Sequence, residues 1–182
     1  YIPVPLLHLS HMERLQFGDT AVGSDEPTYI IAEAGSNHNG ELEMAKELID
    51  VAAEAGVDAV KFQTFRAEKM YTEPDGENEL YDHFKSMEMP YEWIPELHDY
   101  CRQQGVHFLS TPFDAESAEE LAPYVPAFKI ASFSLSHIPL LEHLTELGKP
   151  LILSTGTHDF ADVEAVVDEL AAIGHTDYAL LQ

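Results

Sequence analysis

Short apolar runs alternate with amphipathic segments along these 182 residues, and this alternation predicts an α/β fold of the (β/α)8 TIM-barrel type. Two observations favour a closed barrel over an open doubly wound sheet. The first predicted strand is followed by GSNHNG, which has neither the GxGxxG spacing of a dinucleotide site nor the GK[ST] of a P-loop. Polar residues also end nearly every predicted strand, whereas an open sheet gathers them at one switch point.

The predicted elements follow one another in regular order. Residues 13–28 have turn residues beside short apolar pieces and predict a β-hairpin. Mostly apolar strands, typical of a parallel sheet buried on both faces, are predicted at 28–34, 58–64, 106–111, 127–132, 150–155 and 177–181. Helices are predicted near 41–55, 91–104, 115–122, 138–147 and 160–173, several of them ended by a glycine. The acidic insertion at 65–90 is of a length that is usually a functional loop or lid.

Six strands account for only part of a barrel, because eight strands and about 250 residues make a complete one. We therefore expect the first six β/α units of a longer protein. Residues 1–12 are predicted to be an N-terminal extension, and residues 13–182 a partial barrel domain.

The charge balance is strongly acidic, with 33 Asp and Glu against 9 Lys and Arg. This argues against a nucleic-acid partner, since phosphate neutralisation requires a basic surface. The acids are spread along helix faces, which favours a hydrated surface as in salt-adapted, halophilic organisms; an acidic interaction surface is the alternative. No apolar run reaches the roughly 18 residues that span a bilayer, so no membrane partner is expected.

The single cysteine, Cys101, excludes an intrachain disulfide and suggests a reducing, cytoplasmic location. Cys101 lies near the end of a predicted helix, and no neighbouring base or cation would lower its pKa. We expect a buried structural thiol.

Two lysines lie inside apolar strands, Lys61 in DAVKFQTF and Lys129 in PAFKIASF. A lysine in such a segment must reach water, an acid or a bound anion, because an unpaired desolvated charge is costly. The other polar residues at strand ends are Glu33, Gln63, Ser110, Thr111, Ser132, Ser154 and Thr155. In a barrel these ends converge on one mouth, where lysines and hydroxyls suit a small phosphorylated acid. Each residue alone could equally be structural.

His38 follows the first strand, in SNHNG. A loop histidine is often a solvated or capping residue, but its place beside the expected mouth gives a ligand or substrate-binding role equal weight.

Five strand-end motifs occur together and in order: IIAEAGSNHNG, DAVKFQTF, LSTPFD, FKIASF and GKPLILSTG. Over residues 13–182 the sequence resembles the N-acetylneuraminate (sialic acid) synthase family, which includes legionaminate and pseudaminate synthases and spore-coat polysaccharide homologues. The resemblance implies condensation of phosphoenolpyruvate with an N-acyl amino-sugar aldehyde, such as N-acetylmannosamine, with release of phosphate. It also implies a divalent metal, Mn²⁺ or Mg²⁺, whose ligands lie beyond Gln182, and a homodimer.

The resemblance further implies roles for single residues. Glu33 would contact the acceptor sugar as acid or base, Lys61 would lie towards the phosphoenolpyruvate carboxylate, and Gln63 would line the mouth. Asn78, in the insertion, would contact the sugar. The residues implied to hold phosphoenolpyruvate are Thr111 and Phe113 at the enolpyruvate and Lys129, Ser132 and Ser154 at the phosphate. KIASF is typical of the pseudaminate and spore-coat branches and AGSNHNG of the sialate and legionaminate branches, so the sugar stays open.

Two other hypotheses remain. Another phosphoenolpyruvate-dependent sugar aldol synthase would need a cationic site for the acceptor's phosphate, yet Arg14, Arg66 and Arg102 do not cluster at strand ends. A catalytically inactive sugar-binding barrel is the non-enzymatic alternative. Cations inside strands argue against it, because a scaffold does not require them.

Overall fold

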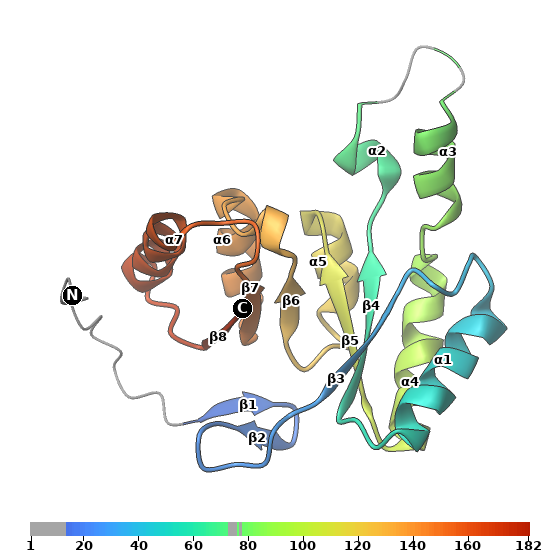
Figure 1. Ribbon diagram of the computed structural model, residues 1–182, viewed down its shortest axis with the longest axis horizontal. Helices are drawn as coiled ribbons and strands as arrows, with labels where there is room; N and C mark the ends of the chain where they lie inside the picture. Colours follow the sequence, from blue (N-terminus) through green and yellow to red (C-terminus); the bar gives the residue numbers. More distant parts are fainter. Residues whose placement is uncertain (1–13, 73–75, 77) are drawn as a thin grey trace.

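The computed structural model describes residues 14–72, 76 and 78–182. The predicted extension at 1–12 lies outside the described residues. The described chain forms an α/β fold with parallel strands, as predicted, and Figure 1 shows helices packed along a curved array of strands.

Six parallel strands form two three-stranded sheets, in the orders β3-β4-β5 and β6-β7-β8. Strands β5 and β6 lie side by side where the two sheets meet. The strands are β3 (Ile31–Gly35), β4 (Ala59–Thr64), β5 (His107–Pro112), β6 (Phe128–Ile130), β7 (Leu151–Ser154) and β8 (Tyr178–Leu181). All six predicted strands are confirmed within a few residues.

The predicted helices are confirmed on the outer face of the strands. They are α1 (Leu42–Glu54), α4 (Ile94–Gln104), α5 (Ala115–Leu121), α6 (Ile138–Glu146) and α7 (Phe160–Ala172). Helix α4 ends at Gly105, whose left-handed backbone (φ 76°) turns the chain directly into β5. Cys101 on α4 is completely buried, and burial raises the pKa of its thiol to about 12, so the expected structural thiol is confirmed.

The described part of the insertion at 65–90 contains two helices that the sequence did not predict. It carries α2 (Ala67–Met70) and α3 (Glu79–Ser86), which stand beyond the carboxyl end of β4 in Figure 1. Both helices are too short to show a clear apolar periodicity, which explains why the sequence did not predict them. Two short 3₁₀ helices, η1 (Tyr91–Trp93) and η2 (Ser132–Ser134), precede α4 and follow β6.

Two apolar clusters hold the fold together. The larger lies between strands and helices and includes Phe62, Phe108 and Phe128. The smaller lies on the inner face of the strands, where Phe17 clusters with one residue from each of four neighbouring segments. These are Ala59 of β4, Leu109 of β5, Ala127 directly before β6, and Ile152 of β7. Side chains alternate along a strand, so these inner positions identify which later residues face the interior.

The predicted hairpin is confirmed as β1 (Leu15–Phe17) and β2 (Thr20–Val22), paired antiparallel below the amino ends of the strands in Figure 1. Phe17, 2% exposed, inserts from it into the inner cluster. His107 fastens the hairpin: its Nδ1 lies 2.7 Å from the Tyr29 hydroxyl and its Nε2 lies 3.1 Å from Asp19 Oδ1. Gly18 lies against the His107 ring with φ +61°, a position that favours glycine.

In the described part of the chain, no helix is both long and apolar enough to cross a bilayer.

We predict that Phe17→Ala lowers the free energy of unfolding of this chain by about 3 kcal/mol, because it empties a site filled by a large buried ring. Urea denaturation followed by circular dichroism measures the change. Phe160→Ala is the matched control, since Phe160 is 60% exposed and its loss leaves no cavity. Equal effects of the two substitutions would contradict the role of Phe17.

Candidate active site

The residues of the predicted mouth lie two positions beyond the inner apolar cluster. Ile31, Ala59, Leu109, Ala127 and Ile152 face the interior, and the alternation of side chains places the next interior residue of each strand towards its carboxyl end. Those next residues are Glu33, Lys61, Thr111, Lys129 and Ser154. The strand geometry thus brings together five of the predicted site residues.

Glu33 and Lys61 are the centre of this group. They are register partners on the neighbouring strands β3 and β4, and they form an ion pair. The Lys61 side chain is 7% exposed, whereas that of Glu33 is 56% exposed. A buried ammonium is therefore held by a carboxylate that still reaches solvent.

Lys129 is the second buried cation, 8% exposed. Its Nζ donates a hydrogen bond of 2.9 Å to the Ile130 carbonyl, and it has no carboxylate partner among the described residues. Burial lowers the pKa of Lys129 to about 8; repulsion by Lys61 lowers it as well, and attraction by Glu33 opposes both. The pKa of Lys129 therefore depends on the charges of both Lys61 and Glu33, so the three groups lie close enough to interact electrostatically.

Polar groups complete the mouth. Gln63 and Thr111 are register partners on β4 and β5, and Gln63 Oε1 accepts a hydrogen bond of 3.3 Å from Ser36 in the loop after β3. Ser132 begins η2 and Ser154 ends β7, and both are half-buried. These side chains can donate to an anion held by the lysines.

Two other polar strand ends do not face the mouth. Ser110 and Thr155 have the opposite alternation, towards the helices. Ser110 is completely buried, where its hydroxyl lies 2.8 Å from that of Thr64. Thr155 donates to the Leu181 carbonyl at 3.0 Å. The expectation that these two converge on the mouth was wrong, because it used strand position without the alternation of faces.

His38 is completely buried after β3, and its ring packs edge-to-face on Trp93 with centroids 5.5 Å apart. Its Nδ1 accepts from the Gly40 amide at 3.1 Å, and its Nε2 has no partner among the described residues. Burial lowers the pKa of the His38 imidazole. The Trp93 contact fixes the loop against η1, directly before α4. The predicted substrate contact stays a prediction.

Asn78 caps the amino end of α3, since its Oδ1 accepts from the Leu80 and Tyr81 amides at 3.1 Å each. This explains the residue structurally. Its predicted contact with a sugar remains a prediction.

An aromatic row borders the mouth and was not predicted. Phe133 stacks on Phe113 at 5.6 Å, Phe113 meets Phe65 edge-to-face at 6.0 Å, and Phe65 meets Phe84 of α3 at 6.4 Å. Tyr71 stacks on Phe84 at 4.8 Å. The sequence signal was available: the motifs at the ends of β4, β5 and β6, QTF, TPF and ASF, each finish with phenylalanine.

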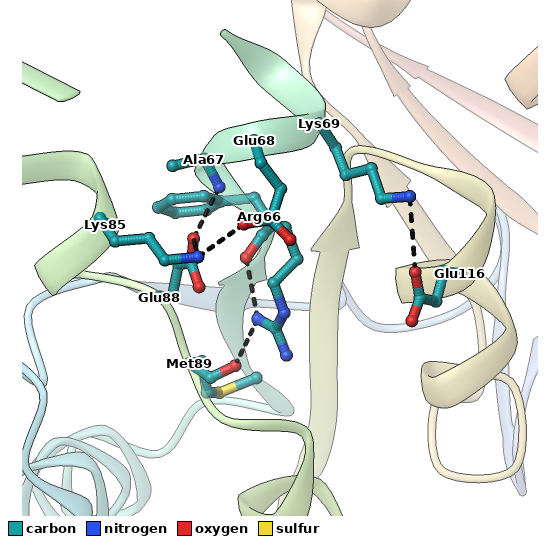
Figure 2. A network of polar contacts seen from close by, with 9 residues as sticks. Arg66, Ala67, Glu68, Lys69, Lys85, Glu88, Met89 and Glu116 are labelled. Atoms are coloured by element: carbon teal, nitrogen blue, oxygen red, sulfur yellow. Dashed lines mark hydrogen bonds and ion pairs between the residues drawn. The ribbon is translucent and has the colours of Figure 1, made fainter. Parts of the chain in front are cut away.

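Arg66 ties the two ends of the insertion together, as Figure 2 shows. Its guanidinium donates to the carbonyls of Phe65 at 2.9 Å and Met89 at 3.0 Å, and it lies 3.6 Å from the centre of the Tyr91 ring. Beside it, Glu88 accepts from the Ala67 amide at 2.7 Å.

Lysines of the insertion are also paired (Figure 2). Lys85 contacts Glu68 at 2.7 Å and Glu88 at 3.1 Å, and Lys69 contacts Glu116 of α5 at 3.7 Å. Among the residues that the structure describes, no group of three His, Cys, Asp or Glu side chains is arranged to hold a metal ion.

Comparison with known proteins supplies the family. The NeuB family model matches residues 48–182, which is most of the chain. The chain belongs to the NeuB family. It is 44% identical to the spore coat polysaccharide biosynthesis protein SpsE of Bacillus subtilis, over 93% of this chain and 48% of SpsE. It is 37% identical to the N,N'-diacetyllegionaminic acid synthase of Legionella pneumophila, over 80% of this chain and 44% of that enzyme.

The fold is similar to that of another relative. The crystal structure of N-acetylneuraminic acid synthetase from Leptospira borgpetersenii superposes with a TM-score of 0.83 at 32% identity, covering 93% of this chain and 60% of that one. The predicted resemblance is confirmed, and the fold is TIM-barrel-like. The chain spans about half the length of the curated NeuB-family relatives it matches.

We predict that the pKa of Lys129, measured by ¹³Cε chemical shift, rises in Lys61→Met, because the repelling ammonium is gone. The pKa falls in Glu33→Gln, because the attracting carboxylate is gone. Lys69→Met is the control, since Lys69 pairs with Glu116 outside this group. No shift in either variant would show that the three charges do not share a site.

We also predict that Arg66→Lys loosens the insertion, since one ammonium cannot reproduce the planar guanidinium contacts with two carbonyls and a ring. Hydrogen exchange of α3 amides should accelerate roughly tenfold, as expected from the loss of about 1.4 kcal/mol. Exchange in α6 should stay unchanged and serves as the internal control. Unchanged exchange in α3 would mean that other contacts hold the insertion.

Proposed function

We propose that this chain forms the phosphoenolpyruvate-binding part of an enzyme that condenses phosphoenolpyruvate with an N-acyl amino-sugar aldehyde. The product is a nonulosonic acid of the sialic type, and phosphate is released. Membership of a family of acid synthases supports this proposal. The observation that carries it is a pair of buried ammonium groups beside a single carboxylate.

The charges fit the donor substrate. Lys61 and Lys129 repel one another in a site with one compensating carboxylate, so a bound anion relieves this repulsion. In the proposal Lys61 lies towards the carboxylate of phosphoenolpyruvate and Lys129 towards its phosphate. Ser132 and Ser154 donate to the phosphate oxygens, and Thr111 and Phe113 border the enolpyruvate.

In the proposal Glu33 acts on the acceptor side. The enol carbon of phosphoenolpyruvate forms a bond to the aldehyde carbon, water adds to the resulting cationic centre, and the C–O bond to phosphate breaks. Glu33, more exposed than Lys61, can exchange a proton with the acceptor oxygen while its other oxygen holds the ammonium. Gln63 lines the same opening.

The divalent metal belongs to the proposal for the whole protein. The family resemblance implies that its ligands lie beyond Gln182. A metal supplies Lewis-acid polarisation of the aldehyde when bound. The residues of this chain bind and orient the donor.

The acceptor is proposed to carry no phosphate. Among the described cations near the mouth, Lys69 and Lys85 pair with glutamates and Arg66 is held by two carbonyls and a tyrosine ring. None of the three is free to take an acceptor's phosphate. This favours the proposed synthase over a sugar-phosphate aldol synthase.

We predict that the full-length protein releases phosphate from phosphoenolpyruvate and N-acetylmannosamine with Mn²⁺ in high salt. Lys129→Ala should raise the KM for phosphoenolpyruvate roughly tenfold or more and nearly abolish turnover, since a charged hydrogen bond to substrate is lost. Lys69→Ala, which removes a cation that is already paired with Glu116, should leave both constants unchanged. An unchanged KM and rate in Lys129→Ala would refute the assignment, and no release with any acylated hexosamine would favour a sugar-binding barrel.

A further inference from the structure

A groove of about 580 Å³ lies at the end of the strands opposite the mouth. It is bounded by the turn of the hairpin and by the loops that precede β4, β5, β6 and β7. The residues used below are Asp19, Asp58, His98, Arg102, Tyr124 and Lys149. Its volume lies within the range that holds small-molecule ligands.

Two cations of this groove have no acidic or hydrogen-bonding partner among the described residues. Arg102 and Lys149 have neither a carboxylate nor a hydrogen-bond acceptor within reach among the described residues. Arg14, Lys46, Lys61, Lys69 and Lys85 each pair with an acid, and Arg66 and Lys129 each bind backbone carbonyls. Arg102 is exposed and Lys149 is half-buried, so both can be reached by a ligand. In a chain with 33 acids and 9 cations, two cations that pair with no described acid lie in the same groove.

Burial strengthens the point for Lys149. It is half-buried, and this burial lowers the pKa of its ammonium, because nothing nearby compensates for lost hydration. The acids in the groove wall are directed elsewhere: Asp19 Oδ1 lies 3.1 Å from His107 Nε2, and Asp58 Oδ2 accepts from the Ile30 amide at 2.7 Å.

The remaining wall is suited to the body of a small molecule. His98 and Arg102 are one turn apart on α4 and therefore share a face. The His98 ring packs edge-to-face on Tyr124 with centroids 5.6 Å apart. A ring surface beside two cations can hold a phosphate group together with a short organic part.

We propose that this groove is a binding site for a small phosphate ester, held by Arg102 and Lys149 and packed against His98 and Tyr124. The site lies at the opposite end of the strands from Lys61 and Lys129, so it is a second ligand site on the same domain. This inference does not depend on the proposed function of the mouth.

The test uses full-length protein carrying Lys129→Met, which removes the phosphate-binding lysine of the mouth while filling its volume. Broadening of the ³¹P NMR signal of glycerol 3-phosphate, and of inorganic phosphate, measures binding. The salt concentration is 0.1 M, at which exposed charges are screened beyond about 10 Å. We expect saturable binding of the ester. Adding Arg102→Gln and Lys149→Gln should weaken it at least tenfold.

The matched control adds Arg14→Gln and Lys69→Gln, which change the net charge equally but remove paired cations outside the groove. It should bind as the Lys129→Met protein does. Tighter binding of the ester than of inorganic phosphate supports contact with the organic part of the ester. Equal binding of the two would show that the groove recognises phosphate alone, and this would overturn the ester assignment. Absence of binding in Lys129→Met, or equal weakening by the control, overturns the site itself. Thermal unfolding of each variant verifies that it is folded.

Discussion

Two buried ammonium groups in a strongly acidic protein are the constraint around which the rest of this domain is arranged. Lys61 and Lys129 lie on different strands, and their positions place both on the inner face above an apolar floor. Among the described residues Glu33 is the one carboxylate that compensates them, and its side chain is more than half exposed to solvent. A fold that keeps two ammonium groups buried needs a polar opening at the carboxyl ends of the strands, rigid strands that hold the lysines, and an apolar cluster that closes the amino ends.

Each of these requirements is met by a different part of the chain. The hairpin seals the floor with Phe17 and is itself fastened through His107. The helices cover the outer face and leave the inner face to the strands. The insertion stands beside the opening, tied at its two ends by Arg66 and joined to β5 by the aromatic row. The charged group is thus supported from below and from one side.

The sequence predicted the strands well because each one is a short apolar run followed by a polar residue and a turn. It also predicted Lys61 and Lys129 as site residues, since a lysine in an apolar strand requires a partner. It failed for Ser110 and Thr155, because a position at the end of a strand does not by itself say which face the residue occupies, and the alternation of side chains turns both towards the helices. It failed for α2 and α3 because four and eight residues carry too little periodic signal. For His38, no sequence pattern distinguishes a loop residue at a mouth from one buried under a tryptophan.

The burial of Cys101 has a practical consequence. The chain has one thiol, and it is both inaccessible and strongly disfavoured as a thiolate. Maleimide reagents should therefore leave these 182 residues unmodified in their native fold. A cysteine introduced at an exposed position of α3 would take a fluorophore alone, without prior removal of the natural one. Motions of the insertion relative to the strands could then be followed by energy transfer in a protein whose core is untouched.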